Sequence, residues 1–168
     1  MDWDFNDNLV AEQFNTLLLL DKQFDSARVK PVFHILGGTA LLFHGVESVV
    51  TIDIDVANKL TDEIKQVVEP FVSDAASEVA VLPKLYETRL VPYKEDCFKN
   101  IKVYLLSIED LIITKLGAGR FKDIEDLTKT GIFKDVDLGK ITSIINAEFP
   151  SAVASQLLIQ LLKIEDYI

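Results

Sequence analysis

Two aspartates at alternate positions are the residues of this sequence best suited to chemistry. Asp53 and Asp55 alternate with apolar residues in the segment 51–56. Because a β-strand sends residues i and i+2 to the same side, a strand here directs both carboxylates one way and turns Ile52 and Ile54 toward the core. Two carboxylates about 7 Å apart along a strand can bind one or two divalent cations together.

A glycine pair precedes these aspartates in the chain. Gly37-Gly38-Thr39 follows the apolar run 32–36 and opens a helix-like pattern. Free backbone N–H groups at a strand-to-helix junction attract anions, and glycines let a phosphate chain approach the backbone closely. Alone, such a pair is also typical of a tight turn, and it matches neither a Walker motif nor a dinucleotide fingerprint. Together with the aspartates, it predicts metal-assisted phosphoryl chemistry.

The acidic pair has a plain structural alternative. The same Asp-x-Asp spacing occurs at Asp2 and Asp4 and again at Asp135 and Asp137, both times in polar segments where carboxylates stay hydrated. An aspartate in a half-buried strand costs free energy unless it is paired or solvated in a cleft. The segment 51–56 could therefore also be an edge strand with a water-facing acidic side.

Lys115 interrupts an apolar stripe. It lies seven, four and three residues after Ile108, Leu111 and Ile112, and no acidic residue follows it at i+3 or i+4. Such a lysine either extends past the core into water or points into a cleft that holds an anion. Both interpretations remain open at this stage.

Charged residues just beyond Lys115 suggest helix-surface pairs. Lys122 and Asp126 have the i, i+4 spacing of a weak ion pair. Asp123 and Asp126 lie one turn apart and could hold Arg120 or a backbone amine, which favours a structural role for them.

The hydrophobic pattern predicts an α/β front and an α-helical tail. We expect helices over 5–22, 39–44, 61–69, 108–118, 122–130, 138–149 and 151–163, and strands over 32–36, 49–56, 79–82, 85–91 and 101–106. The α/β core then covers 1–106 and the helical part 107–168, packed together as one structural unit.

Composition narrows the classes of function. The chain has 168 residues, with 17 basic and 27 acidic side chains and a formal net charge of −10. This charge argues against non-specific binding to nucleic acid. The single cysteine, Cys97, and the acidic N-terminus predict a cytoplasmic protein, and the apolar run 17–20 is too short to span a membrane.

Two islands of this sequence resemble a known superfamily. Leu36-Gly-Gly-Thr-Ala-Leu41 followed by Thr51-x-Asp-x-Asp55 resembles the signature of the nucleotidyltransferases, which have the DNA polymerase β-like fold. The block 107–127 is similar to small bacterial members, including those related to toxins of abortive-infection and toxin–antitoxin systems.

The resemblance implies a mixed β-sheet flanked by helices, in the α/β (α+β) class. It also implies that Gly37, Gly38 and Thr39 hold the triphosphate of an NTP and that Lys115 reaches the phosphates. The superfamily often has serine after the first glycine, where this chain has Gly38, so Thr39 could supply the hydroxyl.

The resemblance further implies that Asp53 and Asp55 bind two Mg²⁺ ions, which Mn²⁺ could replace. Active members use a third carboxylate on a following strand. Glu87 is the best candidate for it, because it lies in an apolar-flanked pattern, whereas the segment 101–106 contains no acid.

Two functions from different classes follow. The first is a Mg²⁺-dependent enzyme that moves an NMP from an NTP to a hydroxyl of a protein, an RNA or a small molecule. The second is a catalytically weak or inactive protein of the same fold that binds a nucleotide or a partner, as an antitoxin or a sensor does. An interaction domain without a ligand is the third and plainest interpretation. The apolar stripe of 151–163 serves internal packing or, alternatively, a homodimer.

Overall fold

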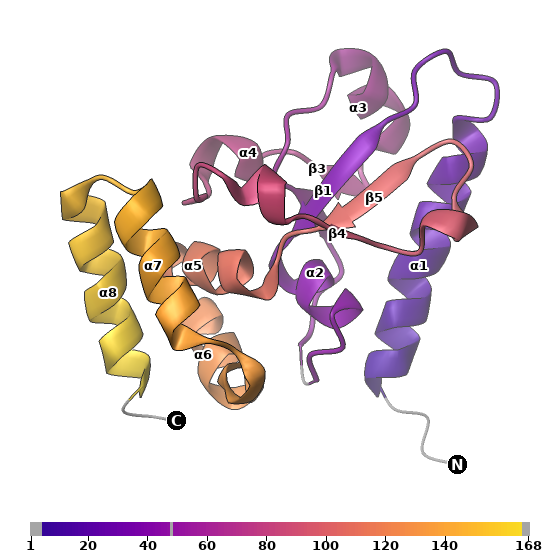
Figure 1. Ribbon diagram of the computed structural model, residues 1–168. Helices are drawn as coiled ribbons and strands as arrows, with labels where there is room; N and C mark the ends of the chain where they lie inside the picture. Colours follow the sequence, from indigo (N-terminus) through magenta and orange to yellow (C-terminus); the bar gives the residue numbers. More distant parts are fainter. Residues whose placement is uncertain (1–4, 48, 166–168) are drawn as a thin grey trace.

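A computed structural model describes residues 5–47 and 49–165, so Asp2 and Asp4 lie outside the described residues. A five-stranded mixed sheet runs through the molecule with helices packed around it, which confirms the expected fold class (Figure 1). The strand order is β3-β2-β1-β5-β4. The strands are β1 (Val32–Leu36), β2 (Ile54–Val56), β3 (Val72–Ser73), β4 (Val91–Pro92) and β5 (Lys102–Leu105).

The centre of the sheet forms where the sequence has its densest apolar runs. β1 pairs in parallel with β5 and antiparallel with β2. Phe33 and Ile35 of β1 are fully buried. The helix α1 (Phe5–Gln23) packs on α2 (Gly37–Phe43) and on α3 (Asp62–Val68), whose N-cap is Thr61. The expected helix starting at residue 39 in fact begins two residues earlier, directly at the glycine pair.

The C-terminal part consists of helices, as expected. They are α5 (Ile108–Ala118), α6 (Phe121–Lys129), α7 (Leu138–Glu148) and α8 (Ser151–Glu165). Ser107 caps α5 by accepting a hydrogen bond from the Asp110 amide. α5 packs on α6, α7, α8 and α2, so it joins the helical part to the sheet part (Figure 1).

Three expected strands differ from the structure. The strand expected over 49–56 is paired only at 54–56, and the segment 79–82 is not a strand. The segment 85–91 forms a 3₁₀-helix, η1 (Tyr86–Arg89), before the short β4. An apolar run becomes a strand only where a neighbouring strand can pair with it. In these three segments, tertiary contacts override the local preference for a strand.

The residues 74–90 form what we call the crossing segment, which includes α4 (Ala76–Val79) and η1. Arg89 fixes its end: Nε and Nη2 donate to the Asp110 carboxylate on α5, and Nη1 donates to Glu148 Oε1 on α7 at 2.6 Å. Glu148 also accepts a hydrogen bond from the Leu85 amide. Asp110 is fully buried, and these bonds fix the end of the crossing segment to α5 and α7 in place of the sheet pairing that the sequence pattern predicts.

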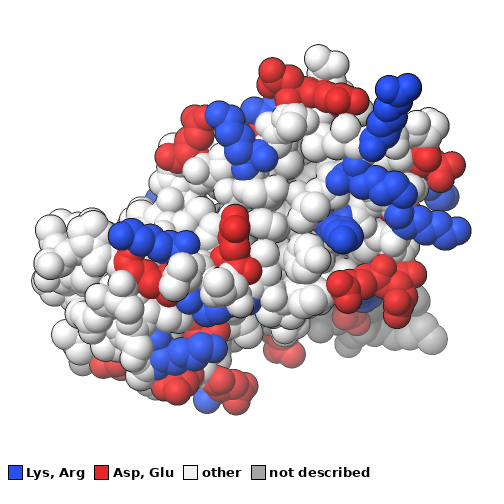
Figure 2. All heavy atoms as spheres, turned by 45° about the horizontal axis from the view of Figure 1, so that its top comes forward, with Lys and Arg blue, Asp and Glu red and all other residues white. Residues whose placement is uncertain are grey.

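Within the described residues, no helix has both the length and the apolar character needed to cross a membrane. On one face of the molecule, acidic and basic side chains are interspersed (Figure 2). The left end of that face, where Figure 1 places α7 and α8, shows fewer of them.

Candidate functional site

The sheet register places Asp55 beside the glycine turn. Asp55 of β2 lies opposite Leu36 of β1 and opposite Ser73 of β3. Opposed residues of neighbouring strands share one face of a sheet. Gly37 directly follows Leu36, and Asp55 Oδ2 lies close to it: a Cβ atom added at Gly37 would be 3.8 Å from this oxygen. The predicted proximity of one aspartate to the glycine turn is confirmed.

Asp55 and Gly37 line a cavity of about 380 Å³. Its walls come from the β1–α2 turn, β2, the crossing segment, α5 and the start of α6. The lining residues are Leu36, Gly37, Asp55, Ala75, Ala76, Val79, Ala80, Val81, Thr114, Lys115, Ala118, Arg120 and Asp123. The cavity thus combines backbone, two carboxylates and two cations from segments far apart in the sequence.

The three residues of the glycine turn occupy different environments. Gly37 has a φ of 69° and lines the cavity, and only glycine adopts this conformation freely. At Gly38, a Cβ atom would lie 2.8 Å from Thr51 Cβ, so this glycine admits the segment before β2. Thr39 is buried and donates a 2.6 Å hydrogen bond to the Asp53 carbonyl. Gly38 and Thr39 thus position the aspartate segment, and their contact with phosphate stays a prediction.

Asp53 lies immediately before β2, and its side chain is exposed. The expectation that Ile52 faces the core is wrong, since this side chain is 77% exposed, whereas Ile54 is buried. Strand pairing begins only at Ile54, so the alternation that governs a strand does not extend back to Ile52.

Burial and the neighbouring charge of Asp53 raise the pKa of Asp55, and the charge of Arg120 partly offsets them. Asp53 is therefore close enough to influence Asp55, although it is not among the residues that line the cavity. Two like charges at the edge of a cavity disfavour ionisation of the more buried one. A bound cation would offset this repulsion between the two carboxylates.

The raised pKa of Asp55 leads to a stability prediction. We expect Asp55→Asn to raise the melting temperature at neutral pH, without added cation, by about 2 °C. The folded protein holds the Asp55 proton more tightly than the unfolded chain, so ionisation costs stability as pH rises through the raised pKa. At pH values below the pKa of Asp55 in the unfolded chain, the rise in melting temperature caused by the substitution should shrink. Thermal unfolding followed by circular dichroism at several pH values measures it, and a variant less stable at neutral pH would contradict the prediction.

Lys115 lines the cavity and is also paired. Its side chain is buried, and Nζ lies 2.7 Å from Asp126 Oδ2 and 3.2 Å from Asp123 Oδ1. Residue spacing within α5 does not predict these partners, because they come from α6. The lysine therefore does not extend into water: it is buried, has charge partners on α6 and lines the cavity. Its contact with an anion stays a prediction.

Arg120 and Asp123 are cavity residues that sequence reasoning assigned only a structural role. Arg120 Nε lies 2.7 Å from Asp123 Oδ2. Burial by itself would raise the pKa of Asp123, but the hydrogen bond from Arg120 and the charge of Lys115 lower it overall. The expected pair of Lys122 with Asp126 does not form, since Lys122 donates to the Val50 carbonyl and Lys115 takes Asp126.

Glu87 lies on η1 instead of on the strand expected for it, and it is exposed. Its carboxylate accepts a hydrogen bond from the Tyr86 hydroxyl at 3.4 Å. Glu87 is not among the residues that line the cavity. A catalytic role for it stays a prediction, and Asp123 is the carboxylate that the fold brings to Lys115 and Asp55.

The donor set determines which cations this site suits. Among the described residues, no group of three or more histidine, cysteine, aspartate or glutamate side chains could hold a metal ion. Asp55 in the cavity and the exposed Asp53, two residues before it, offer hard oxygen donors, which suit Mg²⁺ or Mn²⁺ when a substrate supplies further oxygen ligands. Chemically, the site pairs carboxylates for a cation with a lysine and an arginine for an anion.

The sequence model of one protein family matches residues 11–167 of this chain. The family is described as "Nucleotidyltransferase of unknown function (DUF6036)". No curated protein and no solved structure matches the chain. The matched region includes the whole cavity, from the glycine turn to α6.

Proposed function

We propose, since the chain belongs to the DUF6036 family of nucleotidyltransferases, that it transfers an NMP from an NTP to a hydroxyl group in a reaction that depends on Mg²⁺ or Mn²⁺. One observation carries the proposal. A single cavity gathers Gly37 and Asp55 from the sheet part with Lys115 and Arg120 from the helical part. This combination of carboxylate, cations and exposed backbone suits a metal-bound polyphosphate.

Asp53 and Asp55 are the residues that would hold the cation. The raised pKa of Asp55, caused by burial and by the charge of Asp53, supports this assignment, because a cation would stabilise both ionised forms. When bound, divalent cations lower the pKa of the attacking hydroxyl and neutralise charge on the departing pyrophosphate.

Lys115 and Arg120 would contact the triphosphate, together with the backbone at Gly37. Both cations line the cavity, and Asp123 contacts both. Asp123 thereby holds them in place and limits the movement that a long side chain otherwise has. The Nζ of Lys115 exchanges a carboxylate contact for a phosphate oxygen when the nucleotide enters.

The proposed transfer requires no reactant besides the NTP and the acceptor hydroxyl. The acceptor hydroxyl oxygen forms a bond to the α-phosphorus, and the bond from that phosphorus to the oxygen bridging to the β-phosphate breaks. Pyrophosphate leaves with the electron pair of the broken bond, and the hydroxyl proton passes to water at the cavity mouth. The chain's own residues position the reactants and stabilise charge, which is the main protein contribution in phosphoryl transfer.

The direct test uses each of the four α-labelled NTPs with Mg²⁺ or Mn²⁺, with and without bulk RNA and cell lysate. We expect label on an acceptor and release of pyrophosphate, both abolished by a chelator. A parallel thermal-unfolding series with each NTP and cation measures binding alone. Absence of both transfer and nucleotide-dependent stabilisation would contradict the proposal.

A prediction separates the two candidates for the third carboxylate. We expect Asp123→Asn to reduce transfer by about a hundredfold, because it leaves Lys115 and Arg120 less well oriented. Glu87→Gln should leave the rate within about twofold, because Glu87 lies outside the cavity lining. Rates are compared at saturating NTP, with circular dichroism as the folding control. A large loss in Glu87→Gln would instead support the role predicted from the sequence.

A second candidate function is a nucleotide-binding protein with little or no turnover. Its specific support is that Lys115 is held by two aspartates, Asp123 and Asp126, so part of its charge is already neutralised. The same experiment distinguishes the two: stabilisation by NTP without transfer identifies the binding protein.

A further inference from the structure

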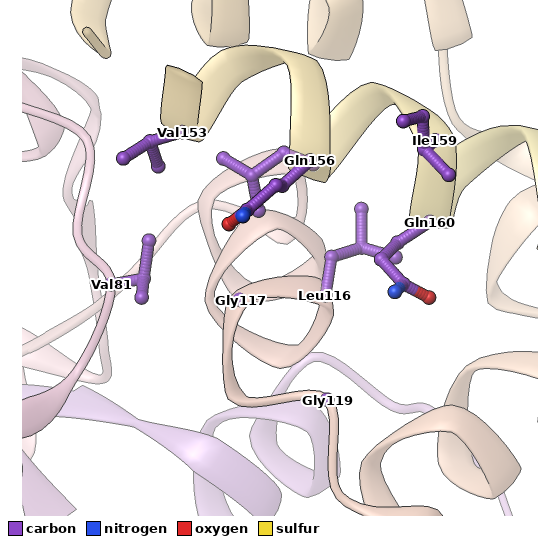
Figure 3. A pocket seen from close by; sticks show the side chains of 9 residues that line it. Val81, Leu116, Gly117, Gly119, Val153, Gln156, Ile159 and Gln160 are labelled. Atoms are coloured by element: carbon purple, nitrogen blue, oxygen red, sulfur yellow. The ribbon is translucent and has the colours of Figure 1, made fainter.

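A second cavity lies beside the candidate active site. It has a volume of about 330 Å³ and is formed between α5 and α8 (Figure 3). Its lining residues are Val81, Leu116, Gly117, Gly119, Val153, Gln156, Leu157, Ile159 and Gln160. We call this cavity the α5–α8 groove. Its size is at the low end for a ligand pocket, enough for a few side chains.

The groove adjoins the active-site cavity through shared walls. Val81 lines both cavities, and the consecutive α5 residues Lys115 and Leu116 line one each. Gly117 makes this arrangement possible, since a Cβ atom there would lie 2.5 Å from Val81 Cβ. Any larger residue would require Val81, and with it the crossing segment, to move away from α5.

The groove carries no charge, although the chain has a net charge of −10. Every lining residue is uncharged, and α8 contains no charged residue before Lys163. Apolar surface on α8 remains open to solvent, including Ile159, which is 52% exposed. Both glutamines line the groove, and Figure 3 shows the amide end of Gln156 directed toward α5 and that of Gln160 below α8, beside Leu116. An amide side chain both donates and accepts hydrogen bonds, as a peptide unit does.

We propose that the α5–α8 groove binds the acceptor of the transfer reaction, and that this acceptor is an uncharged, apolar segment of a polypeptide carrying a serine, threonine or tyrosine hydroxyl. This proposal rests on the proposed function, which it deepens by naming the acceptor class. Apolar side chains fill the groove, and the two glutamine amides pair with peptide groups. An extended chain crosses the width of one helix, about 10 Å, in about three residues. The hydroxyl therefore lies about three residues from the apolar anchor.

Charge decides against an RNA acceptor. Nucleic-acid binding requires lysine or arginine side chains along the phosphate backbone, and the groove lining has none. An acidic protein repels a polyanion further at low salt. An uncharged peptide segment needs no basic side chains and is not repelled by the acidic protein. Transfer of its apolar side chains out of water favours binding.

The test measures NMP transfer from α-labelled NTPs to degenerate peptide libraries and to bulk RNA. Each peptide has a central serine, threonine or tyrosine, with flanking positions, including the third on either side, drawn from alanine, valine, leucine and glutamine. Matched libraries have lysine or glutamate in the flanks. We expect label on the uncharged library, at least about tenfold above the charged libraries and above RNA. Preferential label on RNA or on the charged libraries would overturn the proposal, as would label on no peptide.

Two substitutions on α8 provide a matched pair. Ile159 lines the groove, whereas Leu162 is similarly exposed, at 60% against 52%, and does not line it. We expect Ile159→Lys to raise the KM for peptide about tenfold, with the KM for NTP unchanged, and Leu162→Lys to change neither. Equal effects of the two variants would overturn the groove assignment, as would a drop in light-scattering mass in Ile159→Lys alone, which would assign this face to a second copy of the chain.

The experiments distinguish failure of the proposed nucleotidyltransferase function from failure of the groove proposal. NTP binding, measured by thermal stabilisation, reports on the active-site cavity and does not depend on the groove, whereas release of pyrophosphate reports transfer to any acceptor. If both are present and the two α8 variants behave alike, the groove proposal fails and the nucleotidyltransferase proposal stands.

Discussion

Asp55→Asn is expected to lower the rate of NMP transfer by about a thousandfold or more. Asp55 is the half-buried carboxylate that faces Gly37 in the cavity, and with Asp53 it would hold the catalytic cation. Loss of a charged ligand removes several kcal/mol of transition-state stabilisation, and each 1.36 kcal/mol is a factor of ten in rate. Asp53→Asn should produce a loss of similar size. Initial rates of label transfer, at several Mg²⁺ and Mn²⁺ concentrations, measure both.

A matched control comes from the chain itself. Asp135 belongs to another Asp-x-Asp pair and is exposed beyond α6, outside the lining of the cavity. Asp135→Asn should therefore leave transfer unchanged. Because Asp55→Asn is also expected to be slightly more stable than the parent, a loss of activity with a raised melting temperature would exclude unfolding as its cause. Retention of full activity in Asp53→Asn and Asp55→Asn would refute the metal-dependent mechanism.

Arg89→Ala is expected to destabilise the fold by about 3 kcal/mol, the largest stability effect that we predict. Arg89 pairs with Asp110, which is fully buried, and with Glu148, which is 7% exposed. Removing the guanidinium leaves two carboxylates close together without their cation. Urea-induced unfolding at pH 7 measures the change in the free energy of unfolding.

The pH dependence of this effect has a defined sign. The hydrogen bond from Arg89 holds the pKa of Glu148 below its usual range. The stabilisation is therefore present above the pKa of an unfolded glutamate and is lost as pH falls through the lowered pKa. The difference between Arg89→Ala and the parent should narrow in acid. A triple variant with Arg89→Leu, Asp110→Asn and Glu148→Gln should recover part of the lost stability, since it removes the unpaired charges; no recovery would argue against this electrostatic origin.

This network also explains why the sequence failed at the crossing segment. Leu85 to Val91 reads locally as a strand, but Arg89 and the Leu85 amide bond to groups on α5 and α7, 21 to 63 residues away in the chain. A local pattern contains no information about partners at that distance. The strand prediction for 79–82 fails where Val81 instead packs on Gly117.

The amino-acid sequence by itself determined the elements whose signals are local. The apolar runs of β1 and β5, the caps of α3 and α5, and the helical periodicity after residue 107 follow from side-chain spacing. The nucleotidyltransferase family is indicated instead by resemblance, through the glycine turn and the Asp-x-Asp motif, and the family match confirms it. Only the tertiary structure decided which charged residues meet. It gathered Asp123, Arg120, Lys115 and Asp55 around one cavity, because α6 packs against α5 and residue spacing does not set such distances. It left Glu87 outside the cavity lining, because the bonds of Arg89 and of the Leu85 amide to α5 and α7 fold that segment into η1 instead of a strand.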